Sequence, residues 1–137
     1  MIELVYARVA DELQSVAPCF VGDPPDNVPV PYLFVWGPLP VENPETLSDT
    51  LNYLDEEIHV QVVAKQVPDV LILAGAAKRT LNGWSPTVAG WRMFPLEITG
   101  STNVQTARQI PNEESNTYPA WLTLHVRVQA TKTKGDA

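Results

Sequence analysis

The chain of 137 residues has the usual length of one domain, and its 45% apolar and 18% charged residues exclude a wholly disordered protein. Its net charge of −7, with nine basic residues scattered along the sequence, argues against a protein that binds nucleic acid tightly. The single cysteine, Cys19, excludes an internal disulfide and a thiolate metal cluster, and no apolar run approaches the roughly 18 residues of a membrane span.

The first predicted element is an amphipathic helix over residues 2–17. Apolar residues recur there at spacings of three and four, from Ile2 to Val16. Pro18 ends the helix, because the residue before a proline avoids the α region. Cys19 follows in an apolar stretch without basic neighbours, which predicts a buried, unreactive thiol.

A proline-rich connection over residues 20–31 is expected to be extended and to stay outside any strand ladder. The unbroken apolar run 32–36 then predicts a strand that is buried on both faces. Residues 38–56 form a long excursion that is either a short helix or a structured loop. A helix is favoured by the capping sequence at 43–45 and by leucines at helical spacing as far as Leu54.

Strict alternation over residues 57–65 predicts a half-buried strand, with His59, Gln61 and Val63 on one side of it. A second helix is predicted from about Pro68 to Leu81, followed by a capping signal at 82–83. Its apolar stripe packs on the sheet in this interpretation.

The last third contains a turn-rich loop over 83–90 and an edge strand over 94–98, where Pro95 weakens the ladder. Residues 99–118 are polar, and 103–110 either extend that strand or form an arm. The alternation over 122–130 is the clearest strand signal, and 131–137 are expected to fray. These elements predict one α+β domain over residues 1–137, with an antiparallel or mixed sheet of four or more strands and two main helices on one face.

Catalytic signatures are absent from the sequence, and we expect neither an enzyme nor a bound cofactor. Gly83-Trp84-Ser85 lacks the second glycine of a nucleophile elbow and follows a predicted helix instead of a strand. His59 and His125 lie on the polar faces of two predicted strands. They are either a metal pair or interface and solvated histidines, and we favour the second alternative because a third ligand is missing.

Surface chemistry is more informative than motifs. The outward row of the last strand carries little charge, and so does Gln61, which suits a protein–protein contact as well as water. Trp84 and Trp91 lie in or beside a loop and either contact a partner or cover the edge of the sheet. The candidate interface residues are Thr123, His125, Arg127, Gln129, Gln61, Trp84 and Trp91.

This layout resembles the tail terminator, or tail completion, proteins of long-tailed bacteriophages. The similarity covers nearly the whole chain. It comprises the N-terminal helix, the strand opening Val30-Pro31-Tyr32-Leu33-Phe34-Val35, the long excursion, the strand 58–64 with a helix directly after it, and the closing strand 122–128. The stretch 84–91 and the polar arm 99–118 are expanded relative to that pattern.

The resemblance implies a structural virion protein that is assembled in the host cytoplasm. It implies a homo-hexameric ring that caps the tail tube, ends tube polymerisation and offers the surface that joins the head. Tail-tube protein and a head-closure or connector protein would be its partners, and DNA would pass through without specific binding. The acidic balance fits such a passage, whereas a lumen lined by Arg108 and Arg127 would not. A head-closure or adaptor protein of the neck is the first alternative, and a small enzyme or ligand-binding module around the two histidines is the second.

Overall fold

The computed structural model describes residues 2–38, 53–106 and 119–133. These ranges contain two helices and seven strands. In chain order they are α1 (Ile2–Leu13), β1 (Cys19–Val21), β2 (Tyr32–Trp36), β3 (Tyr53–Ala64), α2 (Val67–Leu81), β4 (Trp91–Met93), β5 (Glu97–Ser101), β6 (Gln105–Thr106) and β7 (Ala120–Lys132).

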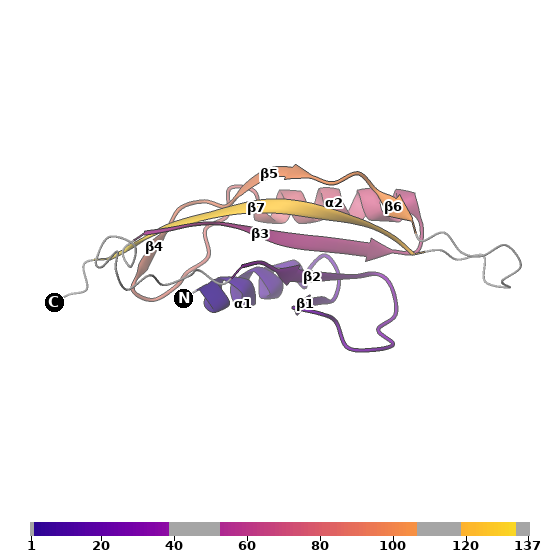
Figure 1. Ribbon diagram of the computed structural model, residues 1–137, viewed down its shortest axis with the longest axis horizontal. Helices are drawn as coiled ribbons and strands as arrows, with labels where there is room; N and C mark the ends of the chain where they lie inside the picture. The colour runs from indigo at the N-terminus through magenta and orange to yellow at the C-terminus, as the bar shows by residue number, and fades with distance from the viewer. Residues whose placement is uncertain (1, 39–52, 107–118, 134–137) are drawn as a thin grey trace, which may run out of the picture.

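The strands form one mixed sheet with both helices on one face, which confirms the predicted α+β class. The strand order is β1-β2-β3-β7-β4, and β5 and β6 also pair with β7. Helix α1 packs against β1 and β2, α2 packs against β3 and β7, and the two helices contact each other. Figure 1 shows the resulting two layers, with the long strands β3 and β7 across the middle of the molecule.

The antiparallel pair β3–β7 is the centre of the sheet. Its register runs from Tyr53 opposite Thr131 to Ala64 opposite Ala120. Apolar side chains at alternate positions point to the helices and are buried, as the period-two pattern predicts. Those buried side chains are Leu54, Ile58, Val60, Val62 and Ala64 of β3, and Leu122, Leu124, Val126, Val128 and Ala130 of β7.

Both ends of this pair correct the predicted boundaries. β3 begins at Tyr53, so Leu54 lies in a strand and not in a short helix; residues 39–52 of the excursion lie outside the described ranges. β7 continues through Lys132, which is two residues into the predicted frayed tail. Each strand of the pair determines where the other ends, because its free N–H and C=O groups continue the hydrogen-bonded ladder beyond the residues that alternate in polarity.

The N-terminal third also departs from the prediction. α1 ends at Leu13, four residues before the predicted end, where Val16 and Ala17 donate backbone hydrogen bonds to the Leu13 carbonyl. The Gln14 side chain holds the segment after the helix. Its Nε2 donates to the Cys19 carbonyl, and its Oε1 accepts from the Cys19 N–H. Cys19–Val21 forms β1, parallel to β2, although the connection from residue 20 was expected to stay outside any ladder.

β2 is buried on one face only, which corrects the prediction of burial on both faces. Leu33 and Val35 point to the helix layer and are buried, while Tyr32, Phe34 and Trp36 are half-buried on the other side. Helix α2 begins and ends close to its predicted bounds. Its C-terminal cap is formed by the Asn82 N–H, which donates to the Lys78 carbonyl, and by a left-handed Gly83.

The predicted edge strand 94–98 is replaced by two short strands. Pro95 has no N–H to donate, and the structure leaves it between β4 and β5, both of which pair with β7. β5 has an irregular register between Ile98 and Gly100. Within 103–110, residues 105–106 form β6, in agreement with the alternative that this stretch extends the sheet; residues 107–118 lie outside the described ranges.

Candidate protein interaction surface

Five of the seven candidate interface residues share the face of the sheet that no helix covers in the described part of the chain. We call this side the open face: the outward side chains of β1, β2, β3, β5 and β7. Along β7 these include Thr123, His125, Arg127 and Gln129, and Gln61 of β3 lies directly opposite Thr123. The alternation of each strand places them there, because residues two apart point to the same side.

Aromatic side chains make half of the open face apolar. Tyr32, Phe34 and Trp36 follow one another along β2, with ring centroids 6.3 and 5.2 Å apart. Phe20 of β1 meets Tyr32 edge-on at 6.4 Å. Val63 lies between Tyr32 and Trp121 in the register and is itself buried, so it joins the five aromatic side chains into one continuous apolar cluster. We call it the aromatic zone: Phe20, Tyr32, Phe34, Trp36, Val63 and Trp121.

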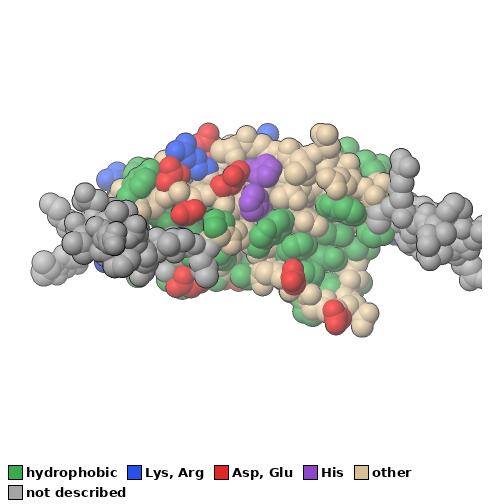
Figure 2. Space-filling model, viewed as in Figure 1, with side chains coloured by type: hydrophobic (Ala, Val, Ile, Leu, Met, Phe, Trp, Pro, Cys, Tyr) green, Lys and Arg blue, Asp and Glu red, His purple; other side chains and the backbone are tan. Residues whose placement is uncertain are grey.

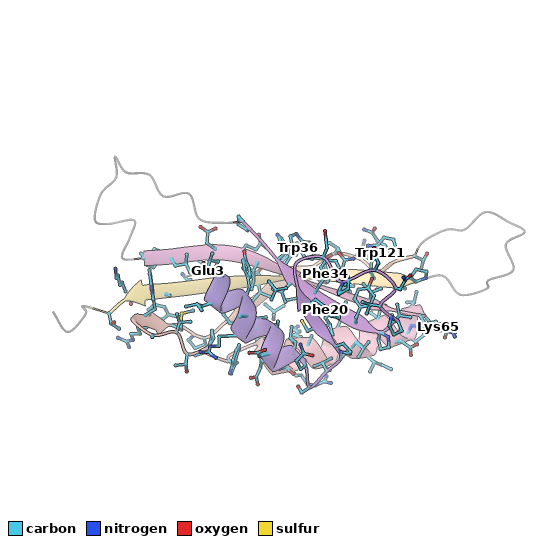
Figure 3. The ribbon with its side chains drawn as sticks, turned by 90° about the horizontal axis from the view of Figure 1, so that it is seen from below. Glu3, Phe20, Phe34, Trp36, Lys65 and Trp121 are labelled. Carbon is cyan, nitrogen blue, oxygen red and sulfur yellow. The ribbon has the colours of Figure 1, made fainter. Side chains whose placement is uncertain are left out.

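Figure 3 shows Phe20, Phe34 and Trp36 side by side, with Trp121 nearer the end of the sheet where Lys65 lies. The aromatic residues are half-buried because they cover one another. Stacked and edge-on rings at these separations gain about 0.5–1.5 kcal/mol per pair beyond their area burial. They still present ring surface to solvent, which is the composition found at the centres of protein interfaces.

The two histidines mark the boundary of the aromatic zone. Trp36 lies opposite His59, and His59 lies opposite His125, with ring centroids 5.2 and 5.1 Å apart. The two Nδ1 atoms are 3.2 Å apart, and His125 Nδ1 is also 3.2 Å from Glu57 Oε1. Desolvation lowers the pKa of His59, the neighbouring His125 lowers it further, and Glu57 opposes both effects.

Charged and polar groups occupy the other half of the open face. Arg127 donates two hydrogen bonds to the Asp55 carboxylate, at 3.0 and 2.9 Å. These bonds lower the pKa of Asp55 and raise that of Arg127. Glu97 of β5 lies opposite Arg127 in the register, on the far side from Glu57. We call Asp55, Glu57, Glu97 and Arg127 the charged zone, in which three carboxylates outnumber one guanidinium.

Figure 2 shows the division of the open face. The histidine pair lies in the middle, hydrophobic side chains gather on one side of it, and acidic and basic side chains gather on the other. The aromatic zone itself contains no charged residue.

The remaining two candidates, Trp84 and Trp91, are placed away from this surface. Both are partly buried and pack against the hydrophobic core. The loop that carries Trp84 is held by backbone hydrogen bonds to Leu96, with 2.8 Å from the Leu96 N–H to the Trp84 carbonyl. Their packing agrees with the alternative that they cover the edge of the sheet.

The aromatic zone was missed as a candidate site. A signal for it exists, because aromatic and aliphatic residues alternate through Tyr32–Trp36, which separates an outward face from an inward one. The run was interpreted only as apolar, and an apolar run does not show which side the helices cover.

Neither a cluster of metal ligands nor a membrane-spanning helix is found in ranges 2–38, 53–106 and 119–133. No group of three His, Cys, Asp or Glu side chains is placed there to hold a metal ion. Neither described helix is long and apolar enough to cross a membrane. Cys19 is buried as predicted, and desolvation raises its pKa to about 12.

Comparison with known proteins finds the same fold in a solved structure. No family model matches the chain, and no curated protein sequence matches it. Among solved structures, the α+β fold is shared by a chain of a structure described as the virion of a native gene transfer agent (GTA) particle. The two chains are 15% identical, the similarity covers 93% of this chain and 94% of that one, and the TM-score is 0.64. At this identity the similarity establishes the common fold.

Proposed function

We propose that this protein is a structural virion component that assembles into a ring on the end of a phage tail tube. The ring ends tube polymerisation and provides the surface to which the head is joined. The observation that carries this proposal is the fold shared, over nearly the full length of both chains, with a chain of a virion particle. The resemblance of the element layout to that of tail terminators supports the same assignment.

The open face supports a function that depends on assembly. Its aromatic zone has the composition of an interface centre, and the charged zone beside it resembles an interface rim. On this proposal the protein acts through its surfaces and catalyses no reaction. The partners are further copies of the chain, the tail-tube protein and a head-closure or connector protein.

The proposed DNA passage is compatible with the charge of the chain. The net charge of −7 disfavours adhesion of a polyanion. Arg127, whose exposure to a lumen would argue against passage, is paired with Asp55 at 2.9 Å. Arg108 lies outside the described ranges.

The direct test is co-assembly with the tail-tube protein of the same particle. Purified chain is added to polymerising tube protein, and tube lengths and ends are measured by negative-stain electron microscopy. We expect short tubes that carry a ring at one end and do not grow further. Unrestricted tubes with bare ends would contradict the proposal, and binding to the connector without any effect on tubes would indicate a head-closure protein instead.

A further inference from the structure

Helix α2 has an apolar outer face that its own fold does not use. The helix packs inward through Val70, Ala74, Ala77 and Leu81, which are buried. Leu71 and Ile72 point the other way, with 53% and 67% of their surface exposed, and Val67 is 38% exposed. We call the α2 outer face Val67, Leu71, Ile72, Gly75, Lys78 and Arg79.

The shape of the α2 outer face favours close approach by another surface. Gly75 lies one turn beyond Leu71 and Ile72, and glycine within a helix costs about 1 kcal/mol relative to alanine. Apart from the nearby backbone of the helix itself, the Arg79 guanidinium is the only described neighbour within 4 Å of a Cβ built at Gly75, at 3.4 Å, so nothing in the described core requires the glycine. A half-buried glycine between large apolar and long basic side chains leaves room for a partner to approach the helix backbone.

The charges of the two surfaces are complementary along their lengths. Helix α2 carries exposed Asp69 in its first turn, beside the α2 outer face. Leu71 and Ile72 of that face follow, and Lys78 and Arg79 lie in the last turn. The open face has the opposite order, from Lys65 beyond the end of β3, through the aromatic zone, to the carboxylates of the charged zone.

The spacing of the two patterns also agrees. Ile72 and Arg79 are seven residues apart on a helix, which is about 10 Å. Gln61, beside the aromatic zone, and Glu57, in the charged zone, are four residues apart on a strand, which is about 13 Å. One helix can therefore place its leucine and isoleucine on the aromatic zone and its basic turn near the carboxylates.

We propose that the α2 outer face of one copy docks on the open face of the next copy, with the helix running along β3. The contact completes a three-layer arrangement in which the sheet is covered on both sides. It deepens the proposed ring function and rests on it. Because α2 and the open face lie on opposite sides of the subunit, the contact is head-to-tail, and such contacts form a ring when the rotation between copies closes.

Cysteine cross-linking tests this pairing directly. Ile72→Cys and Gln61→Cys are combined in one chain and treated with a short bismaleimide; native Cys19 does not compete because it is buried with its pKa raised to about 12. We expect a ladder of covalent multimers from the double variant and only monomer from either single variant. Covalent dimers from Gln61→Cys alone would overturn the proposal, because they require two open faces against each other.

Complementary surface variants give a second, reversible readout by native mass spectrometry. Ile72→Asp and Gln61→Asp are each expected to weaken self-association at least tenfold, while an equimolar mixture forms a 1:1 dimer and nothing larger. Leu4→Asp changes an exposed leucine on α1, outside both surfaces, and is expected to assemble like the wild type. Unchanged assembly of both surface variants would overturn the proposal.

The tube assay separates this inference from the proposed function. Tubes capped by the wild-type protein, together with no cross-links in the double variant, would overturn only the helix-to-sheet contact. If the wild-type protein does not cap tubes and the double variant does not cross-link, the contact and the ring both fail. Circular dichroism melting of each variant is the control for folding. We expect melting temperatures close to that of the wild type, because Ile72 and Gln61 lie outside the core.

Discussion

His59 and His125 face each other across the central strand pair, with their Nδ1 atoms 3.2 Å apart. His125 Nδ1 is also 3.2 Å from Glu57 Oε1, so an N–H on that nitrogen faces two acceptors. His59 accepts in this arrangement only while it is neutral. The lowered pKa of His59 has the same sense, since desolvation and His125 both disfavour its cation.

The pair makes stability depend on pH in a defined direction. The pKa of His59 is lowered from 6.5, so the unfolded chain binds more protons than the folded chain just below that pH. The stability that depends on a neutral His59 is therefore fully present above pH 6.5 and is lost as pH falls through the folded pKa of His59. We expect the free energy of unfolding, measured in urea from pH 8 to pH 5, to fall less steeply for His59→Gln than for the wild type. Identical slopes would contradict this.

The Arg127–Asp55 pair predicts a local titration effect. Because the hydrogen bonds from Arg127 lower the pKa of Asp55, Arg127→Gln is expected to return that pKa toward its ordinary value of 3.8. The measurement is an NMR titration of the Asp55 carboxyl carbon in both proteins. Both side chains are exposed, so we expect little change in melting temperature. An unchanged Asp55 titration would show that the pair does not persist in solution.

Cys19 is predicted to resist alkylation in the folded protein. A rise in its pKa from 9.0 to about 12 lowers the thiolate population roughly a thousandfold at neutral pH, and burial hinders reagents as well. We expect labelling by a thiol reagent at pH 8 to become rapid only in denaturant, as monitored by absorbance. Rapid labelling without denaturant would show that the segment around β1 opens readily.

Gly37 and Tyr6 form a tight contact that a double-mutant cycle can test. A Cβ at Gly37 would lie 2.5 Å from Tyr6 Oη and 3.2 Å from the Ile58 Cα, while Tyr6 Oη donates a 2.9 Å hydrogen bond to the Pro38 carbonyl. We expect Gly37→Ala to destabilise the fold by about 1–3 kcal/mol, as overpacking does.

Removing the Tyr6 hydroxyl relieves part of that clash. The cost of Gly37→Ala should therefore be smaller in the background of Tyr6→Phe, and urea unfolding of the four proteins measures the coupling. Strict additivity would mean that Ile58, through its Cα and its Cγ2, limits the space at Gly37.

Substitution of Trp84 tests whether this residue covers the hydrophobic core or contacts a partner. Because its indole packs against the core, Trp84→Ala is expected to reduce the free energy of unfolding by about 2 kcal/mol. Phe94→Ala is the control, since that ring is 38% exposed and its centroid lies 6.0 Å from the Arg92 guanidinium. Unchanged stability of Trp84→Ala, measured by urea denaturation, would return this residue to the list of interface candidates.

Local periodicity was enough to predict much of the fold. Alternation in β3 and β7 and the apolar stripes of α1 and α2 depend only on which side of each element is apolar, and this is written in neighbouring residues. The same alternation placed Gln61, Thr123, His125, Arg127 and Gln129 correctly on one side of the sheet. The burial of Cys19 likewise followed from its apolar neighbours.

The tertiary structure decided everything that depends on what distant segments cover. Tyr32–Trp36 is equally apolar on both sides in sequence, and only the packing of α1 shows that Leu33 and Val35 are the inner residues. β1 exists because β2 supplies backbone partners, despite the proline-rich sequence that follows it. The sequence alone therefore determined the faces of the elements, whereas the open face, its aromatic zone and the histidine pair arise only when strands far apart in the chain lie side by side.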